Sequence, residues 1–175
     1  MSTMIRSSLG LALLSSLTMF GMEKAKEYTV GMKIPNDTYA GQKVNPVHMT
    51  LTFLGAADAE KLAKATTLLT AINAMRPIKV KVGAADTFGT QEKPILVRRL
   101  AIESPEIAAQ LIALHQELGV CEPGQPTKLA EPNYHVSVKD DKLRAEFITK
   151  EGTIIIGGKL FIKPLGKFDP VVELE

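Results

Sequence analysis

The chain has 175 residues, of which 45% are hydrophobic and 23% are charged, and its formal net charge at pH 7 is +2. These values predict one soluble globular domain with a sizeable core, and a single cysteine excludes an intramolecular disulfide and a cysteine-based zinc site. Proteins that depend on non-specific contacts with nucleic-acid duplexes are usually much more basic, so a small anionic ligand in a local pocket fits better than duplex DNA.

The first 21 residues form an apolar extension that we separate from the domain over residues 22–175. Arg6 precedes a serine-containing apolar stretch that is too short to span a bilayer. It resembles a signal peptide, which would imply export, although no clear cleavage site precedes Glu23. The other interpretation is that translation starts at Met22 and that the protein is cytoplasmic. We favour the internal start and place no chemistry in residues 1–21.

The first half of the domain predicts the order strand, strand, helix, strand, strand. The expected elements are strands over 28–34 and 47–55, a helix from an N-cap at Asp58 to about Met75, and strands over 78–82 and 93–102. Phe88 is expected in a glycine-containing loop between the last two strands. A short polar loop is expected to join the first two strands.

The second half repeats this design. Ser104 and Pro105 predict the start of a helix that ends at Gly119, and His115 is expected on its surface. A strand over 133–140 and two or three further strands follow. We therefore predict an α+β fold in which two antiparallel sheets are each backed by a helix.

The strand VHMTLTFLG at 47–55 carries an unusual polar face. Its apolar set is Val47, Met49, Leu51 and Phe53. His48, Thr50 and Thr52 alternate with them, so period-two geometry places an imidazole and two hydroxyls on the opposite face. A lone histidine on a strand is more often structural than catalytic. This stretch alone therefore predicts a strand and no activity.

NYHVSVKD at 133–140 repeats the pattern in the other half of the chain. Its apolar set is Tyr134, Val136 and Val138. His135, Ser137 and Lys139 share the other face, so a histidine again lies two positions before a hydroxyl side chain. If a pseudo-twofold axis relates the halves, both pairs face one groove.

Two imidazoles and two hydroxyls in one groove suit a particular reaction. The imidazoles can act as general base and general acid in one displacement near neutral pH. The hydroxyls can donate hydrogen bonds to the non-bridging oxygens of a phosphate as charge develops. This equipment predicts in-line attack at a phosphodiester without a metal or another cofactor. The sequence contains no G-x-S-x-G, P-loop or H-E-x-x-H pattern.

The motifs HMTL at 48–51 and HVSV at 135–138 resemble the paired His-x-Thr/Ser motifs of the 2H phosphoesterase superfamily. That group includes 2′-5′ RNA ligase-like proteins and 2′,3′-cyclic phosphodiesterases. The resemblance runs from about residue 28 to residue 168 and covers HMTLTFLG, the helix after it and the KPILVRR strand. The second motif departs by having Ser-Val where Thr-Leu is commoner, and the serine keeps the hydroxyl.

This resemblance implies a fold with two lobes that are related by a pseudo-twofold axis around a central cleft. The segment 35–46 is shorter than in larger RNA ligase-like members, which implies a compact variant with a small substrate. The resemblance also implies roles for the motif residues. His48 and His135 would be the acid and the base, in an order that the sequence leaves open, and Thr50 and Ser137 would hold the phosphate. The substrate would be a 2′,3′-cyclic phosphate or a 2′-5′ linkage in a nucleotide or RNA end. The oligomeric state is open.

Three further residues are candidates for substrate binding. Tyr28 could stack on a base or be a core aromatic. Phe88 could be a core residue or could line the cleft, as an aromatic often does in this family. Lys139 lies two positions beyond Ser137 and could hold a phosphate or end a solvated strand. Arg98 and Arg99 point to opposite faces of their strand, so at most one of them can reach the groove.

Three alternatives to the leading function remain. Compact proteins of this kind occur in bacteriophages, where some resemble anti-CBASS nucleases that linearise cyclic di- and trinucleotide immune signals. A non-catalytic nucleotide-binding module would need the same residues. The last alternative is a structural α+β domain in which the two histidines are coincidental.

Overall fold

A computed structural model describes residues 26–35, 47–121, 127–138, 151–167 and 169–174. Within these residues the chain forms eight strands and two helices. Their order is β1 (Glu27–Lys33), β2 (His48–Ala56), α1 (Ala59–Asn73), β3 (Lys79–Thr90), β4 (Lys93–Ile102), α2 (Pro105–Leu118), β5 (His135–Val138), β6 (Ile154–Ile156), β7 (Leu160–Pro164) and β8 (Val172–Leu174). The strand and helix order expected from the sequence is confirmed.

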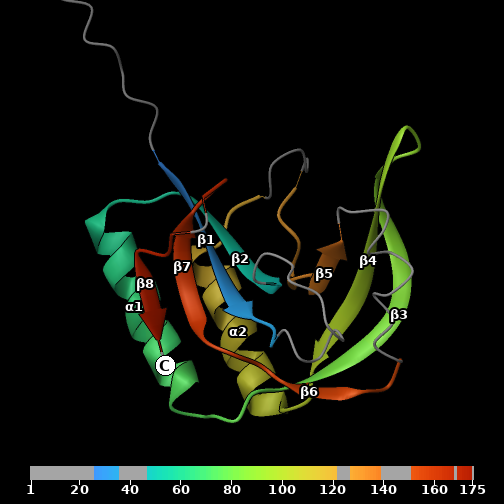
Figure 1. Ribbon diagram of the computed structural model, residues 1–175. Coiled ribbons are helices and arrows are strands. Elements are labelled where there is room, and N and C mark those ends of the chain that lie inside the picture. The colour runs from blue at the N-terminus through green and yellow to red at the C-terminus, as the bar shows by residue number, and fades with distance from the viewer. Residues whose placement is uncertain (1–25, 36–46, 122–126, 139–150, 168, 175) are drawn as a thin grey trace, which may run out of the picture.

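The strands form two four-stranded sheets, in the orders β2-β1-β7-β8 and β5-β4-β3-β6. Every pair of neighbouring strands is antiparallel. The predicted α+β class with two antiparallel sheets is therefore confirmed (Figure 1). The two strands with the His-x-Thr/Ser motifs, β2 and β5, stand at corresponding edges of their sheets, and these two edge strands contact each other.

Both helices begin where the sequence predicts. The Asp58 carboxylate accepts a hydrogen bond from the Lys61 backbone N–H at 2.8 Å, and the Ser104 hydroxyl caps α2 in the same way. Helix α1 packs on β7 and β8 of the first sheet. Helix α2 contacts β2 of the first sheet and β4 of the second, so this helix joins the two sheets.

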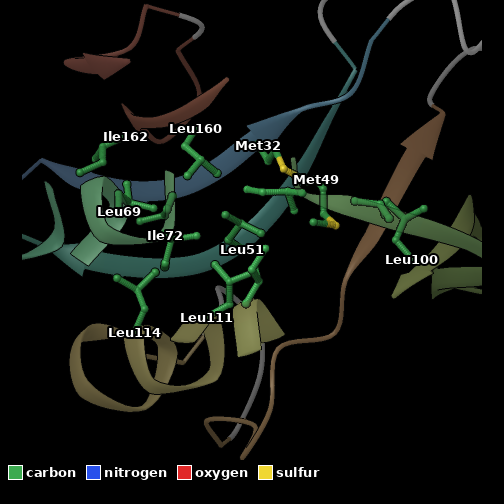
Figure 2. Packing of buried hydrophobic residues seen from close by; sticks show 14 of the residues in the cluster. Met32, Met49, Leu51, Leu69, Ile72, Leu100, Leu111, Leu114, Leu160 and Ile162 are labelled. Carbon is green, nitrogen blue, oxygen red and sulfur yellow. The ribbon is translucent and has the colours of Figure 1, made fainter. Parts of the chain in front are cut away.

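The core lies between the first sheet and the helices and continues onto the second sheet. Figure 2 shows Leu111 and Leu114 of α2 beside Leu51 of β2, and Leu100 of β4 belongs to the same cluster. His115 was expected on the surface of α2, and that expectation is wrong because only 5% of this residue is exposed. Its ring shares the buried face of α2 with Leu111 and Leu118.

Strand β2 does not keep strict alternation along its length. Gly31 pairs with Thr50 and Val30 pairs with Thr52, so Leu51 is an extra residue on β2. Beyond this shift the Thr52 side chain turns to α2, where its hydroxyl lies 2.8 Å from His115 Nδ1. Phe53 is buried but lies outside the main core cluster. The expectation that Thr52 shares the face of His48 and Thr50 is therefore wrong.

The β3–β4 hairpin is longer than the sequence indicated. Phe88 was expected in a loop, but it lies within β3 and pairs with Ile95 of β4. A register shift between Val82 and Ala85 interrupts the pairing, and the hairpin curves (Figure 1). Glycine in this stretch does not end the strand, because the antiparallel partner continues alongside it.

Some expectations fall on residues that the structure does not describe. These are the apolar extension 1–21, most of the segment 35–46, and Lys139. Among the described helices, none is both long and apolar enough to cross a membrane.

Candidate active site

The first motif lies on the edge strand β2. His48 pairs with Lys33 of β1, and Thr50 pairs with Gly31. The side chains of His48 and Thr50 are both half-buried. The His48 ring meets the Phe161 ring of β7 in an edge-to-face contact, with 5.7 Å between the ring centres and 71° between the planes. Phe161 is therefore a neighbour of the motif that lies far from it in sequence.

The second motif lies on the edge strand β5, where His135 pairs with Arg99 of β4 and Ser137 pairs with Val97. His135 is half-buried and Ser137 is exposed. His135 Nδ1 lies 2.8 Å from the backbone carbonyl oxygen of Asn133. A carbonyl only accepts hydrogen bonds, so Nδ1 must carry the proton in this contact. Nε2 is then the nitrogen that can take up or release a proton during a reaction.

Phe88 and Arg99 surround the second histidine. The rings of Phe88 and His135 also meet edge to face, with 4.6 Å between their centres and 74° between their planes. The guanidinium carbon of Arg99 lies 4.6 Å from the centre of the Phe88 ring, within the range of a cation–π contact. Of the two adjacent arginines, Arg99 is the one on the His135 side of the sheet. Sequence reasoning left the choice open.

Arg99 is held by an acidic and an amide side chain. Its Nε and Nη2 atoms donate to Asp86 Oδ2 at 2.8 and 2.5 Å, and Nη1 donates to the Asn133 side-chain oxygen. Hydrogen bonding from Arg99 lowers the pKa of the Asp86 carboxyl, and the Thr87 backbone N–H lowers it further. Asn133 thus touches both Arg99, through its side chain, and His135, through its carbonyl.

The two remaining candidates for substrate binding have different positions. Tyr28 is only 9% exposed and belongs to the core cluster, so the structure favours the core alternative and we no longer count it among the substrate contacts. Phe88 is half-exposed and lies against His135, and its contact with a substrate stays a prediction. In the part of the chain that the structure describes, no three His, Cys, Asp or Glu side chains come close enough together to hold a metal ion.

Tyr134 directly precedes the second histidine, and its half-buried side chain packs against the core cluster with its hydroxyl buried. Among the described residues its hydroxyl has no hydrogen-bond partner, and burial raises its pKa, with the charge of Glu131 adding to the effect. The folded chain therefore holds this proton more tightly than the unfolded chain, whose tyrosines titrate near pH ~10. The resulting stability is complete below that pH and is lost as the pH rises above it.

We expect Tyr134→Phe to remove this alkaline loss. At neutral pH the variant should be as stable as the wild type, or more stable by up to about 1 kcal/mol, because no buried hydroxyl is left unpaired. Urea unfolding of both proteins at about pH 8 and about pH 11, on either side of the tyrosine pKa, measures the difference. An equal decline in the two proteins would show that Tyr134 does not contribute.

The sequence matches no family model and no curated protein. Its fold is similar to that of a crystal structure of a phosphoesterase, at 16% identity and a TM-score of 0.49, over 86% of this chain and 98% of the other. It is also similar to Escherichia coli LigT in complex with 3′-AMP, at 16% identity and a TM-score of 0.48, over 85% and 97% of the two chains.

A third similar structure is Usb1 from Kluyveromyces marxianus, at 10% identity and a TM-score of 0.47, over 85% of this chain and 95% of the other. At such identities the likeness concerns the fold, so the chemistry of this chain must follow from its own residues.

Proposed function

We propose that this protein is a metal-independent phosphodiesterase of the 2H type that hydrolyses a cyclic phosphodiester in a nucleotide or an RNA end. One observation carries the proposal. The edge strands β2 and β5, each with a histidine two positions before a hydroxyl residue, contact each other although they belong to different sheets. Both copies of the motif therefore lie on the two strands that bring the sheets into contact with each other.

In the proposed reaction one imidazole removes a proton from the attacking water as its oxygen bonds to phosphorus. The other imidazole donates a proton to the ribose oxygen that leaves on the opposite side. The P–O bond to that ribose oxygen breaks, and a phosphomonoester and a free hydroxyl remain. For His135 the proton moves at Nε2, since Nδ1 is bonded to the Asn133 carbonyl.

Thr50 and Ser137 have the second role in the proposal. Each hydroxyl donates a hydrogen bond to a non-bridging phosphate oxygen, where negative charge increases towards the transition state. Both residues lie two positions beyond their histidine, so each hydroxyl and its imidazole leave the strand on the same side. Ser137 is exposed and Thr50 is half-buried, as donors to a bound substrate should be before it binds.

The proposal is tested by incubating the protein with phosphodiesters in the presence of EDTA and resolving the products. The panel contains 2′,3′-cyclic nucleotides, a 2′-5′-linked dinucleotide, 3′,5′-cyclic mononucleotides, and cyclic di- and trinucleotides. We expect turnover of at least one 2′,3′-cyclic or 2′-5′ substrate at the same rate with and without the chelator. The matched control is the His48→Ala/His135→Ala protein, prepared in the same way, which detects a contaminating nuclease.

Other outcomes of the panel would point elsewhere. Turnover confined to the cyclic di- and trinucleotides would replace the proposed substrate with the signals that anti-CBASS nucleases cleave. Tight binding of a nucleotide that is recovered intact would indicate a binding module. Loss of turnover with EDTA would overturn the metal-independent mechanism.

A further inference from the structure

We propose that Phe161 and Phe88 are positioning residues that fix the ring orientation of His48 and His135, one phenylalanine for each histidine. The inference rests on the proposed function, and it assigns a role to two residues that carry none of the chemistry. Its basis is that the same arrangement occurs twice, in two sheets with unrelated local sequence.

In the first sheet the phenylalanine reaches the histidine across an intervening strand. Phe161 is on β7, which is the third strand of the order β2-β1-β7-β8, while His48 is on the edge strand β2. Between them, Phe161 pairs with Gly31 of β1, and Gly31 pairs with Thr50. A Cβ atom on residue 31 would lie 2.4 Å from Phe161 Cζ. The absence of a side chain at Gly31 is therefore what lets the ring lie across β1.

The second sheet repeats this placement. Phe88 is on β3, the third strand of the order β5-β4-β3-β6, and His135 is on the edge strand β5. Here the curved β3–β4 hairpin brings the phenylalanine across β4, and Arg99 of β4 lies against the same ring. Both histidines thus receive an edge-to-face aromatic contact from the strand two places away.

Such a contact has a direct use in acid–base catalysis. The χ2 torsion of a histidine is broad, so strand geometry alone does not decide where its ring nitrogens point. An aromatic neighbour that meets the ring edge to face, with ring centres ~4.5–7 Å apart, favours one orientation of the ring over the others. Proton transfer requires the imidazole nitrogen within hydrogen-bond reach of the reacting oxygen, and a displacement of about 1 Å can cost 10²-fold in rate.

The first experiment measures kcat and KM of Phe161→Leu and Phe88→Leu on the 2′,3′-cyclic nucleotide that the wild type turns over. We expect kcat to fall by about 10- to 100-fold with little change in KM, because the substrate still binds while the imidazole is less often aligned. Phe88→Tyr keeps the ring and should restore most of kcat. Phe53→Leu is the matched control, since Phe53 is a buried phenylalanine of the same sheet as His48. It should lose stability and keep kcat.

A double-mutant cycle separates positioning from a general loss of structure. In the His135→Ala background, Phe88→Leu should cause no further fall in the residual kcat, because the group that Phe88 orients is gone. A merely structural phenylalanine would lower the rate by the same factor in both backgrounds. That result would overturn the inference for Phe88.

Phe161 is only 4% exposed, so its replacement could also weaken the fold. The double variant Gly31→Ala/Phe161→Leu addresses this, because the new methyl group enters the space that the ring leaves. We expect Gly31→Ala, added to Phe161→Leu, to raise the melting temperature above that of Phe161→Leu alone without recovering kcat. Recovery of kcat together with stability would show that Phe161 matters for packing alone.

A readout independent of turnover keeps this inference separate from the proposed function. The carbon-bound imidazole protons of His48 and His135 lie near a phenyl ring, whose ring current displaces their proton NMR signals. Phe161→Leu should move the signals of His48 only, and Phe88→Leu those of His135 only. Unchanged signals would overturn the inference even in an active enzyme. If the protein gives the expected NMR shifts but turns over no substrate, the inferred contacts are supported and the proposed phosphodiesterase activity is contradicted.

Discussion

Replacing His48 or His135 with alanine is expected to lower kcat for a 2′,3′-cyclic nucleotide by about 10²- to 10⁴-fold, the usual contribution of a positioned general acid or base. Both histidines are half-buried on edge strands, so their loss should leave the fold intact. Because the two groups act in one displacement, the double variant should be little slower than either single variant. Steady-state kinetics with thermal melting of each variant measures both effects.

The third described histidine provides the matched control. His115 is buried in α2, where Nε2 donates to the Leu129 carbonyl at 2.9 Å and Nδ1 accepts from Thr52. His115→Gln should therefore lower the melting temperature and leave kcat of the folded protein unchanged. Full activity in His48→Ala or in His135→Ala would contradict the proposed mechanism.

The second large effect concerns two threonines on the same strand. Thr50→Val removes the proposed donor to the phosphate and should lower kcat by about 10²- to 10³-fold, as the loss of one such donor does in other enzymes. Thr52→Val removes the hydroxyl that bonds to His115 Nδ1. It leaves a buried nitrogen unpaired, so we expect a loss of about 1–3 kcal/mol in the free energy of unfolding. Its kcat should stay near that of the wild type.

The comparison is sharp because the two substitutions are chemically identical and lie two positions apart. Urea unfolding and kcat, measured on both variants, should give opposite patterns. If Thr52→Val lost activity while Thr50→Val did not, the face assigned to catalysis would be the wrong one. Ser137→Ala provides the equivalent test in the other sheet. There the hydroxyl is exposed, and β5 offers no neighbouring hydroxyl residue that could serve as the matched control.

Most of the fold follows from local signals in the sequence. The caps at Asp58 and Ser104, the helical stripes and the alternating strands are each decided by residues close together, and these elements form where expected. The order of the elements in two similar halves predicted the α+β arrangement of two sheets, and the two copies of the histidine motif are also visible in the sequence. What a local pattern cannot supply is the register of a strand that carries an extra residue relative to its partner.

Thr52 illustrates this limit. Strict alternation places it beside Thr50, but pairing with β1 makes Leu51 an extra residue and turns Thr52 towards α2. The reorientation of Thr52 also explains why His115 is buried. The His115 ring needs a polar partner on another element, and the helical pattern of α2 does not predict that partner. Bulges arise from the tertiary pairing of two strands, so a single sequence gives little warning of them.

The two ring contacts of the histidines were missed for a related reason. Phe161 is more than one hundred positions from His48, and only the strand order brings them together. The signal that could have indicated it is Gly31, a glycine in the middle of an apolar strand, which often marks a close approach of another group. Phe88 was named as a candidate, but its contact with His135 depends on the curvature of a hairpin that was expected to be a loop.

The strand order of the first sheet also has a consequence for how the protein folds. β1 is an interior strand, and Val30 within it pairs with Ile162 of β7, so most of the chain must be enclosed in a loop before this pair can form. Long-range antiparallel pairing of this kind slows folding, because the closure entropy is lost before the contacts compensate for it. Until β7 arrives, β1 presents an unpaired apolar edge on which other chains can add. Refolding yield should therefore fall steeply with protein concentration.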